Sequence, residues 1–154
     1  MAETHWVDKG HASEPATPLN ILLVEDDDVA CESVTRSLRK HGVACPLIWA
    51  EDGLVALQIL RGEHPTKTIG KPLIVLLDLN MPRMNGFEFL RALRMDEQLQ
   101  ATIVFVLTTS DADSDRTRAY HEHIAGFMVK SSVGPQFAQL ARLIQDYRNS
   151  VKLP

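Results

Sequence analysis

The sequence predicts an open, doubly wound α/β domain built on a five-stranded parallel sheet. Five short apolar runs alternate with five segments of helical periodicity, which is the pattern of consecutive βα units. The first, third, fourth and fifth runs are apolar enough for strands that are buried on both faces of a parallel sheet. With 154 residues, of which 45% are apolar, the chain suits one core and a single domain.

Each predicted strand is a short apolar run that ends at a polar residue or a turn signal. The second run is interrupted early by Pro46. Right-handed crossovers should connect the strands, and the spatial order expected for this fold is 2-1-3-4-5. The predicted strands are residues 19–24, 43–50, 72–77, 102–107 and 126–129.

The first three helices are predicted from apolar residues at helical spacing between capping and breaking residues. Asp26 or Asp27 can cap the first helix, which is expected over residues 27–41, and Gly42 can end it. The third helix should begin after the Asn85-Gly86 turn. The expected core-facing positions are Ala30, Val34, Leu38 and His41 in the first helix, Leu54, Leu57 and Leu60 in the second, and Phe87, Leu90 and Leu93 in the third.

The last two predicted helices differ in how firmly they should pack. Residues 111–123 have acidic residues in the first turn but only Ala112, Ala119 and Tyr120 as apolar anchors. This helix should be the least firmly docked. The last helix, from Gly134 onward, should be tied to the core by a continuous apolar stripe. The residues of this stripe are Phe137, Leu140, Ala141, Ile144 and Tyr147.

Composition argues against several classes of function. The formal net charge of -4 and the lack of a long basic block do not support nucleic-acid binding. No apolar run approaches the roughly 18 residues of a membrane span, and the N-terminus lacks the apolar centre of a secretion signal, so a cytoplasmic protein is expected. Residues 1–18 should form a flexible tail before a domain at 19–150, with a short C-terminal tail at 151–154.

The cysteines and histidines do not predict a disulfide or a transition-metal site. Cys31 falls in a helical pattern and Cys45 at a strand start, so both should be reduced thiols. His121 and His123 are two residues apart and therefore do not share a helix face. Trp49, in the second strand, is expected to be a core or edge residue.

Polar side chains follow four of the predicted strands. The strands end, in chain order, at Glu25 and Asp26, at Asp78, at Thr108 and at Lys130. Because ligands of such sheets bind beyond the carboxyl ends of the strands, these groups should lie together. Three carboxylates in one pocket repel one another unless a cation is present, so a hard divalent cation such as Mg²⁺ is expected. The backbone carbonyl of Asn80 is placed to be a further ligand.

Asp78 is the candidate nucleophile of this site. A carboxylate can attack a phosphorus centre and become an aspartyl phosphate, which requires charge neutralisation and alignment more than proton transfer. Thr108 and Lys130 would bond the phosphoryl oxygens. Taken singly, each residue has an ordinary alternative: Asp78 or Thr108 as a turn or capping residue, and Lys130 as a solvated charge. Their common position at strand ends favours the functional interpretation.

The chain resembles the response-regulator receiver domain of two-component signalling, over about residues 19–150. The motifs that carry the resemblance are Val24-Glu-Asp26, Leu77-Asp-Leu-Asn-Met-Pro82 with Asn85-Gly86, Leu107-Thr108, and Gly126-Phe127 through Lys130. The resemblance implies a flavodoxin-like signalling domain that is not an enzyme. Asp78 would take a phosphoryl group from a phosphohistidine on a sensor histidine kinase. Phe127 would turn inward when Thr108 moves toward the phosphate, or else be a simple core or groove aromatic.

Ser131 departs from the family pattern, in which a proline follows the lysine in a cis peptide bond. A cis bond without proline costs about 3 kcal/mol, so a trans bond is expected between Lys130 and Ser131. The loop after the fifth strand is therefore expected to hold Lys130 differently.

A narrower resemblance is to the receivers that are paired with bacterial phytochromes. Residues 62–71, the run Leu107-Thr-Thr-Ser-Asp111 and the end Val151-Lys-Leu-Pro154 carry it. It implies a light-sensing or related histidine kinase, such as a bacterial phytochrome, as phosphodonor, and a homodimer formed by the fourth helix, the fifth strand and the fifth helix. Tyr147, Val151 and Leu153 would extend that interface, or else simply pack the terminal helix and tail.

The leading hypothesis is a single-domain response regulator whose own surface is the output, because nothing after residue 150 is long enough for an output domain. A receiver-like scaffold that works without phosphorylation is an alternative suggested by Ser131. An intermediate carrier in a phosphorelay is another. A magnesium-dependent phosphohydrolase is less favoured, because Asn80 stands where such enzymes place a second aspartate.

Overall fold

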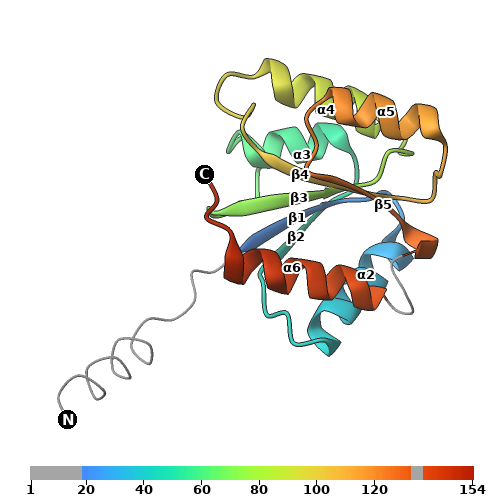
Figure 1. Cartoon of the computed structure of the whole chain (residues 1–154). Helices are drawn as coiled ribbons and strands as arrows, with labels where there is room; N and C mark the ends of the chain where they lie inside the picture. Colours follow the sequence, from blue (N-terminus) through green and yellow to red (C-terminus); the bar gives the residue numbers. More distant parts are fainter. Residues whose placement is uncertain (1–18, 133–136) are drawn as a thin grey trace, which may run out of the picture.

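The structure is a computed structural model that describes residues 19–132 and 137–154. The predicted tail at residues 1–18 and the predicted helix start at Gly134 lie outside the described residues. The described chain forms one five-stranded parallel sheet in the order β2-β1-β3-β4-β5, as predicted (Figure 1). The strands are β1 (Asn20–Val24), β2 (Leu47–Ala50), β3 (Leu73–Leu77), β4 (Ile103–Thr108) and β5 (Gly126–Val129).

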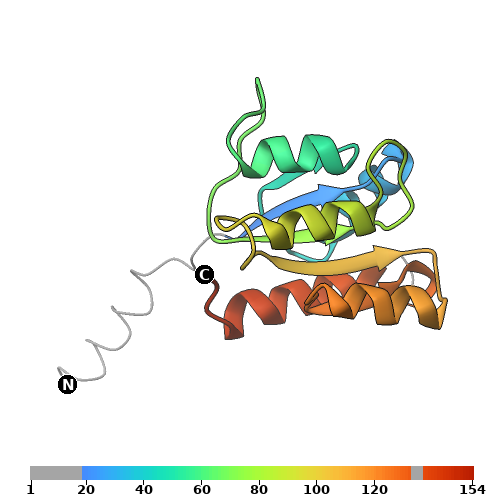
Figure 2. The same ribbon diagram turned by 90° about the horizontal axis from the view of Figure 1, so that it is seen from above.

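Helices cover both faces of the sheet (Figure 1). On one face lie α2 (Asp28–Lys40) and α6 (Ala138–Ser150), and on the other lie α3 (Gly53–Leu60), α4 (Gly86–Met95) and α5 (Asp113–His121). Figure 2 shows the teal α3, yellow-green α4 and orange α5 in chain order across the sheet. A short 3₁₀ helix, η1 (Lys130–Ser132), follows β5 directly. The predicted doubly wound α/β fold is confirmed.

The core consists of two apolar clusters, one on each side of the sheet. In β1, Leu22 and Val24 belong to one cluster, whereas Ile21 and Leu23 belong to the other. Both faces of this central strand are therefore buried, which explains its continuous apolar run. The prediction that β5 is also buried on both faces is wrong. All four of its residues are half-buried, because β5 is an edge strand.

Side-chain caps explain where α2 and α4 begin. Asp27 precedes α2 and accepts a hydrogen bond from the Val29 amide at 2.9 Å. Asn85 precedes α4 and forms a reciprocal capping box with Glu88. After α2, Gly42 adopts a left-handed backbone with φ of 78°, a conformation in which a side chain would be strained. These signals are local, so the sequence predicts the starts of both helices closely.

The buried faces of some helices differ from the predicted ones. Predicted core positions that the structure leaves exposed are His41, Leu54, Ala112 and Tyr120. In α3, the neighbouring Val55 and Ile59 are buried instead of Leu54, which is 44% exposed. Ala119 is the single buried residue of α5, which agrees with the weak docking expected for this helix. A helix carries several overlapping apolar spacings, and contact with the sheet selects one of them.

Cys31 and Cys45 are both free thiols, as expected. Cys31 is buried, and burial raises the pKa of its thiol. Throughout residues 19–132 and 137–154, no helix has the length and apolar character needed to cross a membrane.

Candidate functional site

The register of the sheet brings the predicted site residues to one edge. The last residues of β1 and β3 pair with each other, so the following residues, Glu25 and Asp78, leave the sheet side by side. Thr108 pairs with the last residue of β5, which directly precedes Lys130. Side chains separated by up to 105 positions in the chain thus meet at the carboxyl ends of the parallel strands.

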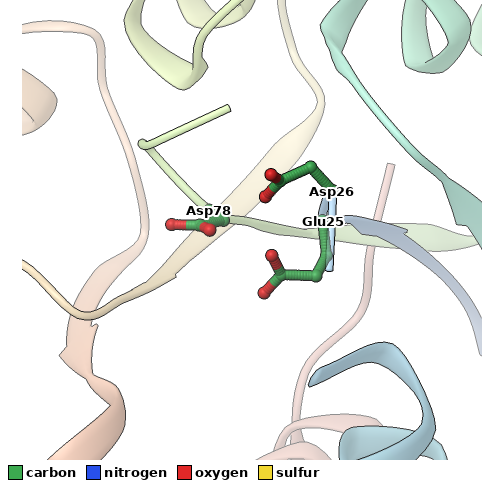
Figure 3. A group of neighbouring side chains, drawn as sticks. All are labelled: Glu25, Asp26 and Asp78. Carbon is green, nitrogen blue, oxygen red and sulfur yellow. The ribbon is translucent and has the colours of Figure 1, made fainter. Parts of the chain in front are cut away.

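Three carboxylates form a cluster at this edge (Figure 3). Glu25 and Asp26 follow β1, Asp78 follows β3, and one carboxylate oxygen from each lies within 4.8 Å of the others. Glu25 and Asp78 are buried, with 3% and 7% of their surface exposed, whereas Asp26 is exposed. A donor set made only of oxygen atoms suits a hard divalent cation such as Mg²⁺. The residues present therefore fit the predicted cation.

Lys130 supplies positive charge to this cluster. Its Nζ donates to Glu25 Oε1 at 2.5 Å and lies 3.8 Å from Asp78 Oδ2. The only cis peptide bond in the described part of the chain precedes Pro72, so the bond between Lys130 and Ser131 is trans, as predicted. The lysine side chain nevertheless lies at the site and is only 16% exposed. The proline of the family pattern is therefore not required to bring Lys130 to Asp78.

Asp78 Oδ1 accepts hydrogen bonds from two neighbours. Thr108 Oγ1 donates at 3.1 Å, and the backbone amide of Asn80 donates at 3.3 Å. Thr108 is completely buried, so its hydroxyl depends on protein partners. Asn80 lies in the loop that follows β3, and the assignment of its carbonyl as a cation ligand stays a prediction. The two oxygens of Asp78 thus face different groups, a hydroxyl on one side and an ammonium on the other.

Burial gives Glu25 an unusual protonation equilibrium. Removal of its carboxylate from water raises the pKa of Glu25 from 4.5 to about 7. The hydrogen bond from Lys130 lowers this pKa, whereas the neighbouring charge of Asp78 raises it. Burial and the neighbouring charge of Asp78 thus both oppose ionisation of Glu25. A divalent cation bound among the carboxylates would favour the ionised form.

Trp49 contacts the site in a way that the sequence does not indicate. Its indole Nε1 donates to the backbone oxygen of Glu25 at 2.6 Å. Lys67, in the connection after α3, donates to the Trp49 backbone oxygen at 2.6 Å and lies 5.6 Å from the centre of the indole ring. Trp49 is in the edge strand β2, consistent with one of the two predicted positions. Only the register of β1 and β2 reveals that its side chain reaches Glu25.

Other predicted functional residues lie away from the carboxylates. Phe127 is half-buried and packs against the core on the side of α3, α4 and α5, and its role as a switch stays a prediction. Tyr147 packs edge-to-face on Phe105, with ring centres 5.3 Å apart. Leu153 also packs against the core, whereas Val151 is 42% exposed. For Tyr147 and Leu153, these contacts support the alternative of packing within the chain.

The fold and the carboxylate cluster together define a receiver-type signalling domain. The sequence profile of the response regulator receiver domain matches residues 21–142, and the chain belongs to this family. It is a response regulator receiver of two-component signalling. Such proteins act with sensor kinases and are generally not enzymes.

Similar proteins match over most of the chain. It is 34% identical over 145 residues to the probable methanogenesis regulatory protein FilR2 of Methanothrix harundinacea, which covers 94% of this chain and 91% of that protein. It is 32% identical over 120 residues to response regulator Rcp1 of Synechocystis, covering 78% of this chain and 82% of Rcp1.

Solved structures of response regulators are also similar to this chain. The phosphorylated cyanobacterial phytochrome response regulator RcpA has a TM-score of 0.78 and 29% identity, covering 90% of this chain and 99% of that chain. The Mn²⁺-bound form of Rcp1 has a TM-score of 0.75 and 30% identity, with the same coverage of 90% and 99%.

Proposed function

We propose that Asp78 accepts a phosphoryl group from a phosphohistidine of a sensor histidine kinase. The observation that carries the proposal is the environment of the Asp78 carboxylate. It is buried, it accepts a hydrogen bond from Thr108 at 3.1 Å, and it lies 3.8 Å from the Lys130 ammonium. Phosphoryl transfer requires alignment and positive charge around the transferred group, and these neighbours supply both.

Four side chains of this chain and one backbone carbonyl would take part in the phosphoryl transfer, together with Asp78. An oxygen of Asp78 forms a bond to phosphorus while the bond from phosphorus to the kinase histidine breaks, and the electron pair returns to the imidazole nitrogen. Lys130 and Thr108 then bond the phosphoryl oxygens. A Mg²⁺ ion held by Glu25, Asp26, Asp78 and the Asn80 carbonyl would supply further neutralising charge. The Mn²⁺-bound form of the similar protein Rcp1 supports a divalent cation here.

The phosphoryl group would signal by shifting an existing equilibrium between conformations. It adds charge and acceptor oxygens beside Thr108, whose hydroxyl would leave its present bond to Asp78 and donate to the phosphate. Phe127 then turns inward. α5 is the element that responds, because a single buried side chain attaches it to the core. The altered surface of α5, β5 and α6 would bind a downstream protein or a second copy of the chain.

The similarity to RcpA suggests the donor kinase. RcpA is a cyanobacterial phytochrome response regulator. We therefore propose a bacterial phytochrome as the kinase, and the cytoplasm as the place where the two proteins meet. A terminal switch and a carrier in a phosphorelay would use the same site. A scaffold that is never phosphorylated was suggested by Ser131, but the position of Lys130 at the carboxylates argues against it.

Intact-mass measurement tests the proposal directly. After incubation with acetyl phosphate and Mg²⁺, the wild type should gain the mass of one phosphoryl group, and Asp78→Asn should gain none. Asp28→Asn is a matched control, because Asp28 is an exposed carboxylate in the first turn of α2 and should not affect the adduct. The proposal fails if the wild type forms no adduct or if Asp78→Asn forms it equally well.

A further inference from the structure

A buried carboxylate outside the cation cluster joins the loop after β3 to the start of α3. Asp52 is 2% exposed, and its Oδ1 accepts a hydrogen bond from the Val55 amide at 2.9 Å, which caps α3. Its Oδ2 accepts one hydrogen bond from Arg83 Nε at 2.7 Å and another from Nη2 of the same guanidinium. One oxygen of Asp52 thus holds the helix, and the other holds the loop.

Arg83 belongs to the same loop as the predicted cation ligand Asn80. The loop runs from Asp78 to the start of α4, and Arg83 is three residues after Asn80. The backbone of Arg83 is left-handed, with φ of 62°, which is disfavoured for a residue that has a Cβ atom. Such a conformation persists when surrounding contacts hold it, and the pair with Asp52 is such a contact.

Backbone contacts also join the loop after β3 to the start of α3. The Gly53 amide donates to the Met84 backbone oxygen at 3.3 Å. A Cβ atom at Gly53 would lie 2.8 Å from Met84 Cγ and 3.0 Å from Phe89 Cβ, so the loop lies directly against the start of α3. At the other end of the loop, the Gly86 amide donates to the Leu79 backbone oxygen at 3.0 Å. The loop is therefore attached both to α3 and to its own beginning.

We propose that Asp52 and Arg83 are positioning residues for the cation site. The pair holds the loop in the conformation that directs the Asn80 carbonyl toward the carboxylates. This inference rests on the proposed function, because it takes Asn80 as a ligand of the cation. Without the pair, the cation would have to order the loop when it binds, and its affinity would fall.

The guanidinium of Arg83 is suited to this task because it donates from two nitrogens to one carboxylate oxygen. A planar fork fixes the direction of the loop as well as its distance from Asp52. A lysine at this position would keep the positive charge but would lose the two N–H groups that donate together to Asp52. The Arg83 side chain is 58% exposed and the Asp52 side chain only 3%, so Arg83 can be replaced without opening a cavity in the core.

Titration of the metal-free chain with Mn²⁺, followed by the electron paramagnetic resonance of the free ion, tests the inference. Arg83→Gln should weaken Mn²⁺ binding by about tenfold, the lower end of the effect of residues that support metal ligands. Asp52→Asn should have a similar effect while keeping an oxygen that can cap α3. Arg83→Lys should weaken Mn²⁺ binding less than Arg83→Gln does. The double variant should bind Mn²⁺ about as well as either single variant, because both remove the same contact.

A matched control breaks a different ion pair of α3. Arg61, the C-cap of α3, pairs at 3.1 Å with Asp96, the C-cap of α4, so this pair joins the ends of the two helices that are opposite to the loop after β3. Arg61→Ala should leave Mn²⁺ affinity unchanged. Hydrogen exchange of the metal-free proteins gives a second readout. The amides of residues 79–86 should exchange faster in Arg83→Gln, whereas those of the central strands should exchange as in the wild type.

The possible outcomes separate the inference from the proposed function. If the wild type does not bind Mn²⁺, the cation site and the inference both fail. If the wild type binds Mn²⁺ and Arg83→Gln binds it equally well, only the inference fails. If weaker binding comes with faster exchange throughout the sheet, Asp52 and Arg83 have a general structural role, and the inference is overturned.

Discussion

Glu25 should make the metal-free protein less stable as the pH rises toward neutrality. Its pKa is raised from 4.5 to about 7, chiefly because burial removes the carboxylate from water. A carboxyl group with a raised pKa in the folded state binds its proton more tightly there. Its contribution to stability is therefore fully present below its unfolded pKa and is lost as the pH rises through about 7.

The size of the effect follows from the two pKa values. The interval from 4.5 to about 7, at about 1.4 kcal/mol per pH unit, corresponds to a loss of about 3 kcal/mol. Urea unfolding of the wild type and of Glu25→Gln, without divalent cations, measures it between about pH 4.5 and about pH 8. Glutamine does not titrate, so the difference between the two proteins isolates Glu25.

A stability difference that does not change with pH would refute this reasoning. So would a wild type that gains stability over Glu25→Gln as the pH rises. Glu32→Gln is the control, because Glu32 is 68% exposed in a surface pair with Arg36 and should give a nearly flat difference. With Mg²⁺ present, the free energy of unfolding of the wild type should instead rise with pH, and that of Glu25→Gln should not. Cation binding to the folded state adds stability and requires ionised carboxylates.

Three further substitutions test contacts around the site. Gly86→Ala would place a Cβ atom 2.7 Å from the backbone oxygen of Asp78, so the free energy of unfolding should fall by about 1–3 kcal/mol in urea. Thr108→Val removes the hydroxyl that donates to Asp78 Oδ1, which should lower the free energy of unfolding by about 1 kcal/mol. Its phosphoryl adduct should still be detected by intact mass after incubation with acetyl phosphate. Trp49→Phe leaves the Glu25 backbone oxygen without its indole donor and should cost about 1–2 kcal/mol in the same urea assay. An unchanged unfolding midpoint in any of these variants would contradict the contact that it tests.

Much of the fold could be predicted because its signals are local. The apolar runs of the central strands, the caps at Asp27 and Asn85, and the stop at Gly42 each depend on a few neighbouring residues. The errors occur where a distant neighbour decides burial. β5 is apolar enough to predict burial on both faces, yet all four of its residues are only half-buried, and Leu54 is a predicted core residue that is exposed.

The members of the candidate site were also recognisable in the sequence. Polar residues at the ends of apolar runs must lie at one edge of a parallel sheet, whatever the details of packing. Glu25, Asp26, Asp78, Thr108 and Lys130 were selected on that ground. The structure brings them together, with carboxylate oxygens within 4.8 Å and Lys130 at 2.5 Å from Glu25.

The amino-acid sequence alone therefore predicted the fold class, the strand ends and the chemical types of the site residues. Hydrophobic periodicity and the residue that follows each strand can both be recognised from a few neighbouring residues. The sequence did not predict the hydrogen bonds that other side chains make to the site residues and to the loop after β3. The indole of Trp49 on Glu25 and the guanidinium of Arg83 on Asp52 depend on strand register and on a loop packed against a helix. Both contacts join segments 24 or more residues apart, and only the packed chain brings such segments together.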